Sequence, residues 1–249
     1  MYHNFNSKKY NCQLCKYKLY IDIDFLINKC YTLSEYKINM LIEKEKIMQH
    51  YYSESPKIKS NKGNIIYTIL DKNIELITDN GVFSKSKVDF GTDLMLRVFL
   101  KNNKRDKFEF LDIGCGYGVV SVVVKTFFKD SKLTLSDVNE RALDLSKENL
   151  IKNNILEFEI IKSDIFDNFD NEKTFDIILS NPPIRTGKET IFKIYEESYK
   201  RLNKNGEFWC VIQTKHGAKS TYKKLEDIFG KCETIEIDGG YRVFRTIKS

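Results

Sequence analysis

The hydrophobic positions of this 249-residue chain change period repeatedly beyond residue 108, from short apolar runs to longer amphipathic stretches. Short runs bounded by polar residues are typical of strands buried in a sheet, and apolar positions three to four residues apart are typical of helices. The predicted strands are 108–113, 133–137, 158–164, 175–180 and 207–213, and the predicted helices are 191–202 and 219–229, with a further apolar stretch at 119–124. Residues 232–237 and 241–247, joined at Gly239-Gly240, predict a hairpin. The pattern therefore predicts an α/β fold, a doubly wound sheet whose last strand is antiparallel.

Two smaller elements precede this alternation. Residues 87–100 predict a helix, with Asp89 near its start. Residues 64–70 and 74–78, on either side of Asp71-Lys72-Asn73, predict a small hairpin.

The candidate chemistry begins at Asn181-Pro182-Pro183-Ile184, which follows the apolar run 175–180. Open α/β sheets bind ligands at the carboxyl ends of their strands, so this tetrapeptide is an active-site candidate. The Asn side-chain carbonyl and the carbonyl before a proline accept hydrogen bonds, and two prolines hold these acceptors in place. Such a pair suits an exocyclic amine, whose lone pair it can turn toward an electrophile without a charged general base.

A glycine turn earlier in the chain suggests the electrophile. Gly114-Cys115-Gly116-Tyr117-Gly118 follows the predicted strand 108–113, and Asp112 stands two residues before it. The dinucleotide fingerprint is G-x-G-x-x-G, whereas this turn is G-x-G-x-G. An acid beside the turn would repel a pyrophosphate but attract the ammonium of an amino-acid-bearing nucleoside. The sequence therefore favours S-adenosylmethionine over NAD as the cofactor.

Two further acids end the next two predicted strands. Asp137 follows the strand after that of Asp112, where a carboxylate would bind both ribose hydroxyls. Asp164 would accept from the adenine amino group while Ile165 packs against the ring. Each acid is alternatively a helix N-cap or a turn residue, a role compatible with ligand contact, and Asn139 is a candidate cap for the helix after Asp137.

Together these residues resemble the class I S-adenosylmethionine-dependent methyltransferases. The resemblance is carried by the runs 112–118, 163–164 and 181–183 and by Asp137. Two longer runs, 79–91 and 181–188, further resemble the short, single-domain members of the ribosomal RNA small-subunit methyltransferase C family, which methylates the exocyclic amine (N2) of a guanine. The resemblance extends from about Gln49 to Lys248. It implies a Rossmann-like methyltransferase fold, a seven-stranded, mostly parallel sheet with a C-terminal antiparallel hairpin.

The resemblance also implies roles for individual residues. Asn181 and Pro182 would orient the target amine, and the substrate would also contact Pro183, Ile184, Arg185 and Lys188. The cofactor would contact Asp112, Gly114 and Gly116 with its methionine portion, Asp137 with its ribose, and Asp164 and Ile165 with its adenine. A segment containing Phe83, Asp89 and Gly91 would line the cofactor pocket from above.

One residue departs from the pattern of amine methyltransferases. Many of these enzymes place an aromatic residue where Ile184 stands, and it stacks on an extruded base. In this chain Phe83, Tyr241 or another aromatic side chain would have to supply that face.

The composition is that of a soluble enzyme of the cytoplasm. The chain is 41% apolar and 31% charged, has no apolar run long enough to span a membrane, and opens without the apolar core of an export signal. Its six cysteines include Cys115 in the glycine turn and Cys210 and Cys232 in predicted strands. We therefore predict reduced core thiols rather than disulfides.

The net charge of +6, from 41 Lys and Arg against 35 Asp and Glu, does not by itself reveal a nucleic-acid substrate. Arg185 and Lys188 flank the candidate catalytic loop, where cations would meet phosphates near a target base. Lys57, Lys59 and Lys62 fit a solvated surface equally well. From the resemblance we expect ribosomal RNA or the assembled small ribosomal subunit as the partner, no membrane, and a monomeric enzyme.

The first 47 residues precede the resemblance. Cys12, Cys15 and Cys30 are half a zinc ligand set, with His3 and His50 as the nearby histidines, so we predict no metal. Residues 1–47 are either upstream of a true start at Met48 or an arm that grips RNA. Residues 48–249 are the predicted methyltransferase domain, which includes the small N-terminal hairpin.

Two other functions remain open. A methyltransferase that acts on an adenine amine or a protein glutamine amide also uses an Asn-Pro-Pro loop, but usually carries an aromatic residue where Ile184 stands. An inactive cofactor-binding, RNA-binding domain is disfavoured by the intact Asn181 and by the complete series of acids.

Overall fold

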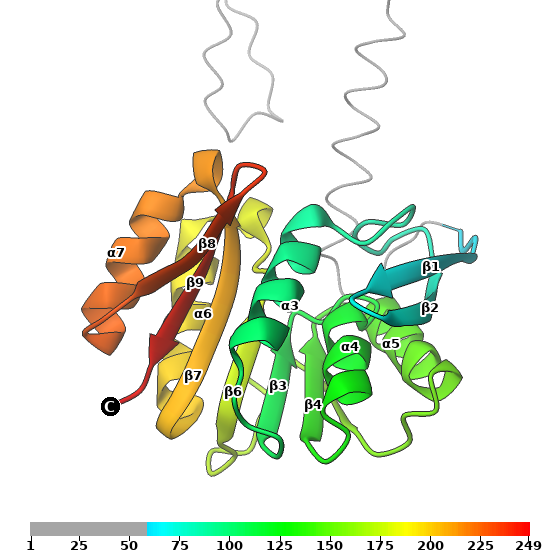
Figure 1. Cartoon of the computed structure of the whole chain (residues 1–249), viewed down its shortest axis with the longest axis horizontal. Coiled ribbons are helices and arrows are strands. Elements are labelled where there is room, and N and C mark those ends of the chain that lie inside the picture. The colour runs from blue at the N-terminus through cyan, green and yellow to red at the C-terminus, as the bar shows by residue number, and fades with distance from the viewer. Residues whose placement is uncertain (1–58) are drawn as a thin grey trace, which may run out of the picture. The chain divides into compact units, whose positions relative to one another are not determined.

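A seven-stranded sheet forms the centre of the computed structural model, which describes residues 59–249 (Figure 1). Its strands are β3 (Glu109–Ile113), β4 (Lys132–Asp137), β5 (Glu159–Lys162), β6 (Phe175–Ser180), β7 (Leu202–Gln213), β8 (Glu233–Asp238) and β9 (Tyr241–Ile247). The order across the sheet is β5-β4-β3-β6-β7-β9-β8, parallel from β5 to β7 and antiparallel where β9 pairs with β7 and β8. The predicted seven-stranded, mostly parallel, doubly wound sheet with a C-terminal antiparallel hairpin is therefore confirmed.

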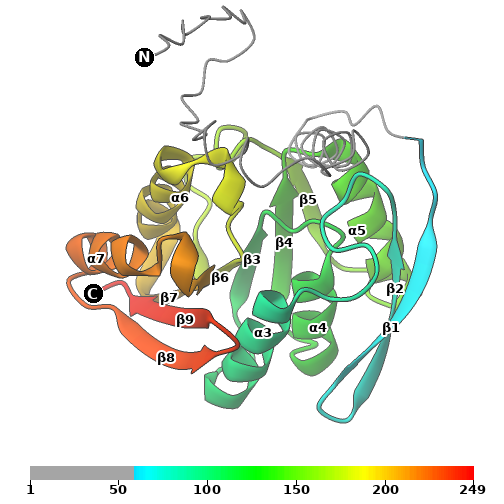
Figure 2. The ribbon, with the colours of Figure 1, turned by 90° about the horizontal axis from the view of Figure 1, so that it is seen from above.

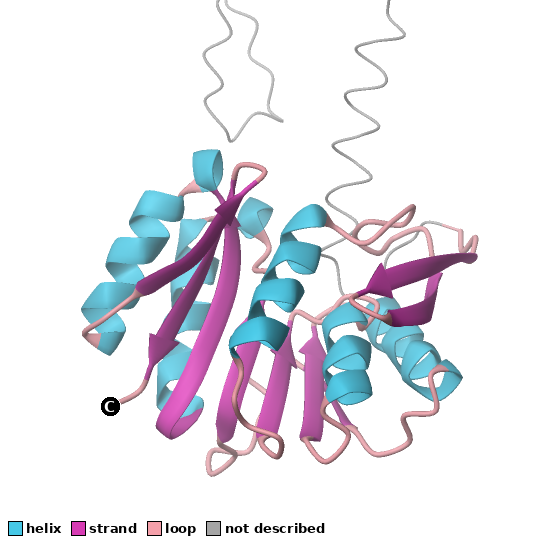
Figure 3. Ribbon diagram, viewed as in Figure 1, coloured by secondary structure: helices cyan, strands magenta, loops and turns pink. Residues whose placement is uncertain are grey.

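Helices cover both faces of this sheet, so the described residues form three layers (Figure 2, Figure 3). One face carries α3 (Phe90–Asn102), α4 (Val119–Phe127) and α5 (Glu140–Lys152), and the other carries α6 (Lys188–Arg201) and α7 (Ala218–Phe229). Two 3-10 turns, η1 (Ile184–Thr186) and η2 (Thr214–His216), follow the carboxyl ends of β6 and β7.

Alternating side chains of the central strands supply a core to each face. On β7, Trp209 and Val211 pack with the residues of α3 and α4, whereas Phe208, Cys210 and Ile212 pack with those of α6 and α7. Successive strand residues point to opposite faces, so a continuous apolar run serves two cores at once. This is why the strands read as unbroken apolar runs in the sequence.

The N-terminal hairpin is a separate two-stranded antiparallel sheet of β1 (Gly63–Ile69) and β2 (Lys72–Thr78). Its turn is Leu70-Asp71, one step earlier than predicted, because Lys72 already pairs with Ile69. Leu70 has a positive φ of 50°, a conformation that a two-residue hairpin turn demands.

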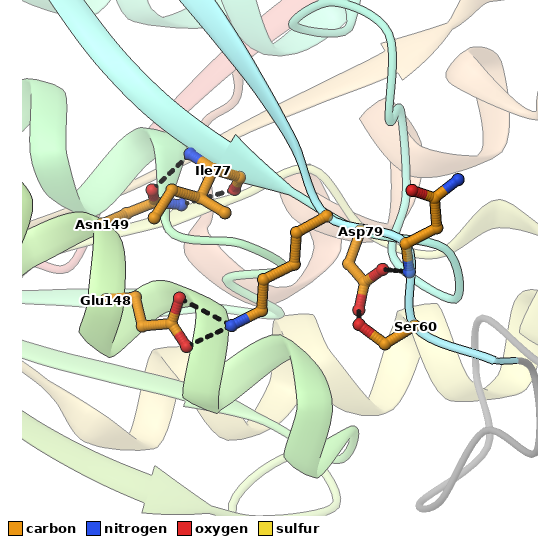
Figure 4. Close-up of polar contacts among 7 residues, drawn as sticks. Ser60, Ile77, Asp79, Glu148 and Asn149 are labelled. Carbon is orange, nitrogen blue, oxygen red and sulfur yellow. Dashed lines mark hydrogen bonds and ion pairs between the residues drawn. The ribbon is translucent and has the colours of Figure 1, made fainter.

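Helix α5 holds this hairpin and the segment before it (Figure 4). Asn149 donates from Nδ2 to the carbonyl of Ile77 at 2.9 Å and accepts the Ile77 N–H at 2.6 Å. Glu148 pairs with Lys62, at 2.6 Å between Oε1 and Nζ. Asp79, directly after β2, accepts the Ser60 hydroxyl at 2.7 Å. Burial alone would raise the pKa of Asp79, but this bond and two from backbone N–H groups lower it. The carbonyl of Lys59 also accepts from Nδ2 of Asn80 at 3.3 Å, so the described chain is bonded to the fold from its first residue.

Several predicted boundaries were wrong. Helix α3 begins at Phe90 where residue 87 was predicted, and α6 begins at Lys188 where residue 191 was predicted. The third strand of the sequence pattern, expected to reach Asp164, ends at Lys162, and Asp164 lies in the following turn. β7 begins at Leu202, where the sequence predicts the end of a helix, because Leu202 pairs with Phe175. Its register then shifts, and Asn205 and Gly206 bond to the backbone of Lys248 beside them.

The cysteines of the described chain, Cys115, Cys210 and Cys232, are free and buried, as the sequence predicts. Between residues 59 and 249, no helix is both long and apolar enough to cross a membrane. Several predictions fall outside these residues: the half ligand set of Cys12, Cys15 and Cys30, the proposed start at Met48, and the lysine at 57.

Candidate active site

The glycine turn lies at the carboxyl edge of the sheet, directly after β3. Gly114 and Gly116 have positive φ angles of 70° and 56°, a region that favours glycine. A Cβ atom added to either would meet no atom within 4 Å, so open space faces the turn. Cys115 between them is buried, with its Sγ 3.4 Å from the hydroxyl of Ser146. The turn therefore presents bare backbone to a ligand on one side and is packed on the other.

Asp137 ends β4 beside this turn and is half-buried. Its Oδ2 accepts the Gly116 N–H at 2.9 Å and its Oδ1 accepts the Asn139 N–H at 2.9 Å. Burial raises the pKa of Asp137, although these backbone bonds act in the opposite direction. Each carboxylate oxygen has a second lone pair, so Asp137 can still accept hydroxyl groups while it holds the turn. Asn139 caps α5, accepting from the N–H groups of Arg141 and Ala142, as the sequence suggests.

Asp112 is placed differently from the other acids. It is 2% exposed, and its Oδ2 accepts both the N–H (3.0 Å) and the hydroxyl (2.6 Å) of Ser121 in α4. Burial raises the pKa of Asp112 to about 7, against the two bonds from Ser121. The observed contacts of Asp112 anchor α4 to β3, and its contact with the methionine portion of a cofactor stays a prediction.

Asp164 and Ile165 follow β5 at the same edge. The Asp164 side chain is exposed and forms no bond to another described residue, while its carbonyl accepts the Asp167 N–H at 3.0 Å. Ile165 is half-buried with a φ of 52°, an uncommon and strained conformation for a β-branched residue. A strained residue beside a free carboxylate fits a ligand-binding turn, and the adenine contact stays a prediction for both.

Asn181 follows β6 and is bonded to residues far away in the sequence. Its Nδ2 lies 3.1 Å from Oδ2 of Asp89 and 2.9 Å from Oγ1 of Thr92. Asp89 is the N-cap of α3, and the same Oδ2 accepts the Thr92 N–H at 3.2 Å. The structure thus brings the start of α3 against the Asn-Pro-Pro loop, and no described residue donates a hydrogen bond to Oδ1 of Asn181.

The rest of the loop is short and tightly turned. The carbonyl of Pro183 accepts the N–H of Thr186 at 3.0 Å, which closes η1, whereas the carbonyl of Pro182 accepts no bond from a described residue. Ile184 and Arg185 lie within η1, and Ile184 is half-buried. Lys188 begins α6, exposed, with its Nζ 5.0 Å from the centre of the Phe192 ring.

Two aromatic side chains lie beside Asp89, and the candidate Phe83 forms no ring contact with either of them. Phe83 is 45% exposed, in the loop before α3. Tyr241 packs so closely on Gly91 that an added Cβ there would lie 2.8 Å from the ring and 3.1 Å from Oδ2 of Asp89. Phe90 is 43% exposed, and its ring centre is 5.6 Å from that of Tyr241. Tyr241 and Phe90 thus form an aromatic pair beside Asp89.

Sequence reasoning missed Thr92 and Phe90. Thr92 lies three residues after the N-cap, where a hydroxyl carries no signal beyond ordinary helix composition. Phe90 is the first residue of α3, and its contact with Tyr241 joins positions 151 residues apart.

A cavity of about 650 Å³ lies at the opposite edge of the sheet. It is lined by residues at the starts of β3 to β6, including Glu109, Lys132, Glu159 and Phe175. Lys132 pairs with Glu109, and Lys173 with Glu159, so much of its charge is already matched. The candidate site residues line the other edge, where parallel α/β sheets bind ligands.

Comparison with known proteins decides what kind of enzyme carries this arrangement. The sequence model of the methyltransferase small domain matches residues 73–245. The chain belongs to this family. The predicted membership of the class I S-adenosylmethionine-dependent methyltransferases is thereby confirmed, and S-adenosylmethionine is the cofactor of this class.

Two relatives are similar to this chain over most of its length. The chain is 42% identical over 200 residues to the uncharacterised protein YbxB of Bacillus subtilis, an alignment that covers 80% of this chain and 98% of YbxB. It is 36% identical over 183 residues to ribosomal RNA small subunit methyltransferase C of Actinobacillus pleuropneumoniae, covering 72% of this chain and 53% of that relative. The chain therefore spans about half the length of that relative.

A solved structure shares the fold of the described chain. It is the T. thermophilus 16S rRNA guanine-N2 methyltransferase in complex with AdoMet and guanosine, with a TM-score of 0.67 and 23% identity over 78% of this chain and 52% of that one.

The carboxyl edge fits the cofactor of the methyltransferase small domain family. Open space before Gly114 and Gly116 admits a ligand to the backbone. Asp137 keeps lone pairs for hydroxyl groups, and the exposed Asp164 is free to accept an amino group.

Proposed function

We propose that this protein transfers a methyl group from S-adenosylmethionine to the exocyclic amine (N2) of a guanine in ribosomal RNA, in the small subunit. One observation carries the proposal: Asn181 stands at the carboxyl end of β6, on the same edge as the glycine turn, with its carbonyl oxygen free to accept a hydrogen bond. This is the group that an amine methyltransferase needs at that place.

In the proposed reaction, Asn181 and Pro182 bind and orient the target amine. When bound, S-adenosylmethionine supplies an electrophilic methyl group. Oδ1 of Asn181 and the carbonyl oxygen of Pro182 would each accept a hydrogen bond from one N–H of the amine, which holds its lone pair out of the plane of the base. The amine loses one proton to water as it gains the methyl group. No charged general base is needed, because the amine becomes acidic only as the new bond forms.

Relatives support guanine N2 as the target. Relatives matched over about half their length are named ribosomal RNA small subunit methyltransferase C, and the T. thermophilus neighbour is named for guanine N2. Ile184, where adenine and glutamine methyltransferases usually carry an aromatic residue, points the same way. The aromatic pair of Phe90 and Tyr241, beside Asp89, is available to stack on a base.

Basic residues around the loop support an RNA substrate. Lys188 begins α6 directly after the catalytic loop, and Lys215 lies in η2 after the adjacent strand β7. Neither forms an ion pair with another described residue, so both are available to phosphates. We include Arg185 in this set from its position in the sequence. The proposed partner is ribosomal RNA or the assembled small subunit, and the proposed enzyme acts as a monomer in the cytoplasm.

The proposal is tested by following the methyl group from labelled S-adenosylmethionine. The protein is incubated with naked ribosomal RNA, with assembled small subunits and with soluble proteins, and the RNA is then digested to nucleosides for mass spectrometry. We expect the label in N2-methylguanosine, and far less of it with the Asn181→Ala variant. Label in N6-methyladenosine or in a protein glutamine would replace the proposal with one of the two alternatives.

A further inference from the structure

We propose that Asp89 and Thr92 are positioning residues that fix which end of the Asn181 amide faces the substrate. The inference rests on the proposed function, in which Oδ1 of Asn181 accepts a hydrogen bond from the target amine. It gives Asp89 a role other than the contact with the cofactor that the sequence predicts.

The chemistry of the three side chains determines the orientation. The two ends of an Asn amide have nearly the same shape, but one accepts hydrogen bonds and the other donates them. An ionised carboxylate only accepts, so the end of Asn181 that lies 3.1 Å from Oδ2 of Asp89 is the NH2 group. Its second proton is donated to Oγ1 of Thr92 at 2.9 Å. With both protons bonded, Oδ1 of Asn181 is held at the opposite end of the amide.

The opposite orientation would block the reaction. A flipped Asn181 would present two donors to a substrate amine that also donates, and the pair would repel. It would also place its carbonyl against the carboxylate of Asp89, two acceptors without a proton between them. Asp89 and Thr92 therefore hold Asn181 in the productive orientation before the substrate binds, so that its acceptor oxygen is preorganised.

The charge of Asp89 assists in a second way. Asp89 forms no ion pair with another residue between 59 and 249, and its negative charge acts on its surroundings. Burial first and then this charge raise the pKa of the neighbouring Tyr241. A carboxylate behind the amide polarises Asn181, which makes its carbonyl a stronger acceptor.

The cap and the positioning role are separable by substitution. Ser is as good an N-cap as Asp but too short to reach Asn181, so Asp89→Ser keeps the helix and removes the contact. Asp89→Asn keeps both the cap and an acceptor. Thr92→Val removes the second acceptor of Asn181, and Thr92→Ser is its matched control.

The test combines kinetics, cofactor binding and the amide signal of Asn181. For Asp89→Ser we expect kcat on RNA to fall about ten- to a hundredfold, with the melting temperature and the S-adenosylhomocysteine affinity unchanged and with partial recovery in Asp89→Asn. In the Asn181→Ala background the same substitution should cost nothing further, because Asp89 acts only through Asn181. The side-chain 1H–15N signal of Asn181, identified by its loss in Asn181→Ala, should shift in Asp89→Ser and Thr92→Val and remain near its place in Thr92→Ser.

Other results overturn the inference. A loss of cofactor affinity in Asp89→Ser, or a further loss of rate on top of Asn181→Ala, would make Asp89 a cofactor residue. An unmoved amide signal would show that Asp89 does not hold Asn181. If the wild-type protein methylates no RNA, the proposed function fails, and the amide signal still decides whether Asp89 and Thr92 set the orientation of Asn181.

Discussion

The two halves of the proposed site differ in the groups to which their polar side chains bond. In the half that we propose for the cofactor, formed by the loops after β3, β4 and β5, two acids accept backbone N–H groups: Asp137 from Gly116 and Asn139, and Asp112 from Ser121. In the amine half, Asn181 is held by two side chains of another element, Asp89 and Thr92. Asp112 and Asp137 are therefore part of the framework of the fold, whereas Asn181 belongs to a network of side chains that join two elements. Substitutions in the first half should change binding or stability, and those in the second should change turnover.

The largest expected effect is the loss of turnover in Asn181→Ala. The deleted carbonyl matters when the amine becomes nucleophilic, so we expect kcat to fall about a thousandfold with S-adenosylhomocysteine affinity nearly intact. Parallel turnover and calorimetric assays separate the two quantities. A joint fall of rate and cofactor affinity would erase the distinction between the halves.

The next largest effect concerns Asp112, because burial raises the free energy of its ionised form. The pKa of Asp112 is about 7 in the fold against 3.8 as its ordinary value. Between pH 3.8 and about pH 7 the folded protein keeps a proton on Asp112 that the unfolded chain releases, so the free energy of unfolding falls as the pH rises. Asp112→Asn carries no such charge. The free energy of unfolding of Asp112→Asn minus that of the wild type should therefore increase by about 3 kcal/mol between pH 5 and pH 8, at about 1.4 kcal/mol per pKa unit.

Thermal and urea unfolding at the two pH values measure this difference. An advantage that is independent of pH would show that Asp112 is ionised in the fold at no cost. The affinity of the same variant for S-adenosylhomocysteine reports whether Asp112 also attracts the methionine ammonium.

A smaller effect is expected from Asp137→Ala, the counterpart of Asn181→Ala in the cofactor half. Loss of the acceptor for ribose hydroxyls should weaken cofactor binding by roughly 1.5 to 3 kcal/mol. Asp144→Ala, which removes the same charge from an exposed position of α5, is the matched control. Asp137→Asn keeps one acceptor oxygen, which can accept the N–H of Gly116 or of Asn139 but not both, so its melting temperature reports how far the turn depends on the second bond. An unchanged affinity in a folded Asp137→Ala protein would remove the ribose assignment.

The smallest effect is expected from a change outside both halves, a chain that begins at Met48. Every described strand and both halves of the site lie downstream, so the melting temperature and cofactor affinity should barely change. If residues 1–47 are an RNA-gripping arm, truncation weakens RNA binding and flattens its salt dependence. If the truncated chain failed to fold, the predicted domain boundary at Met48 would be wrong.

The contrast between the halves also explains what the sequence predicts well. The sheet, its helices and the cofactor half follow from local patterns: apolar runs, a glycine turn with positive φ angles, and acids at strand ends. The prediction of Asn181 as a site residue rests on a pattern of the same kind, an apolar run that ends in Asn-Pro-Pro. The sequence does not predict the bond between Asn181 and Asp89, because Asp89 lies 92 residues upstream and its local pattern is that of an N-cap, which it also is. The burial of Asp112 was missed because its partner Ser121 is one polar residue in an apolar helix, with no distinguishing pattern.

The central claim is that the cofactor is bound by the loops after β3, β4 and β5, and the amine by the loop after β6 with the start of α3. A titration of the 15N-labelled protein with S-adenosylhomocysteine, followed by guanosine, tests it most directly. We predict that the cofactor moves the backbone amides of Gly114, Gly116 and Ile165 most, and that guanosine then moves the side-chain amide of Asn181. Changes centred on the cavity at the opposite edge, around Lys132 and Glu159, would contradict the claim.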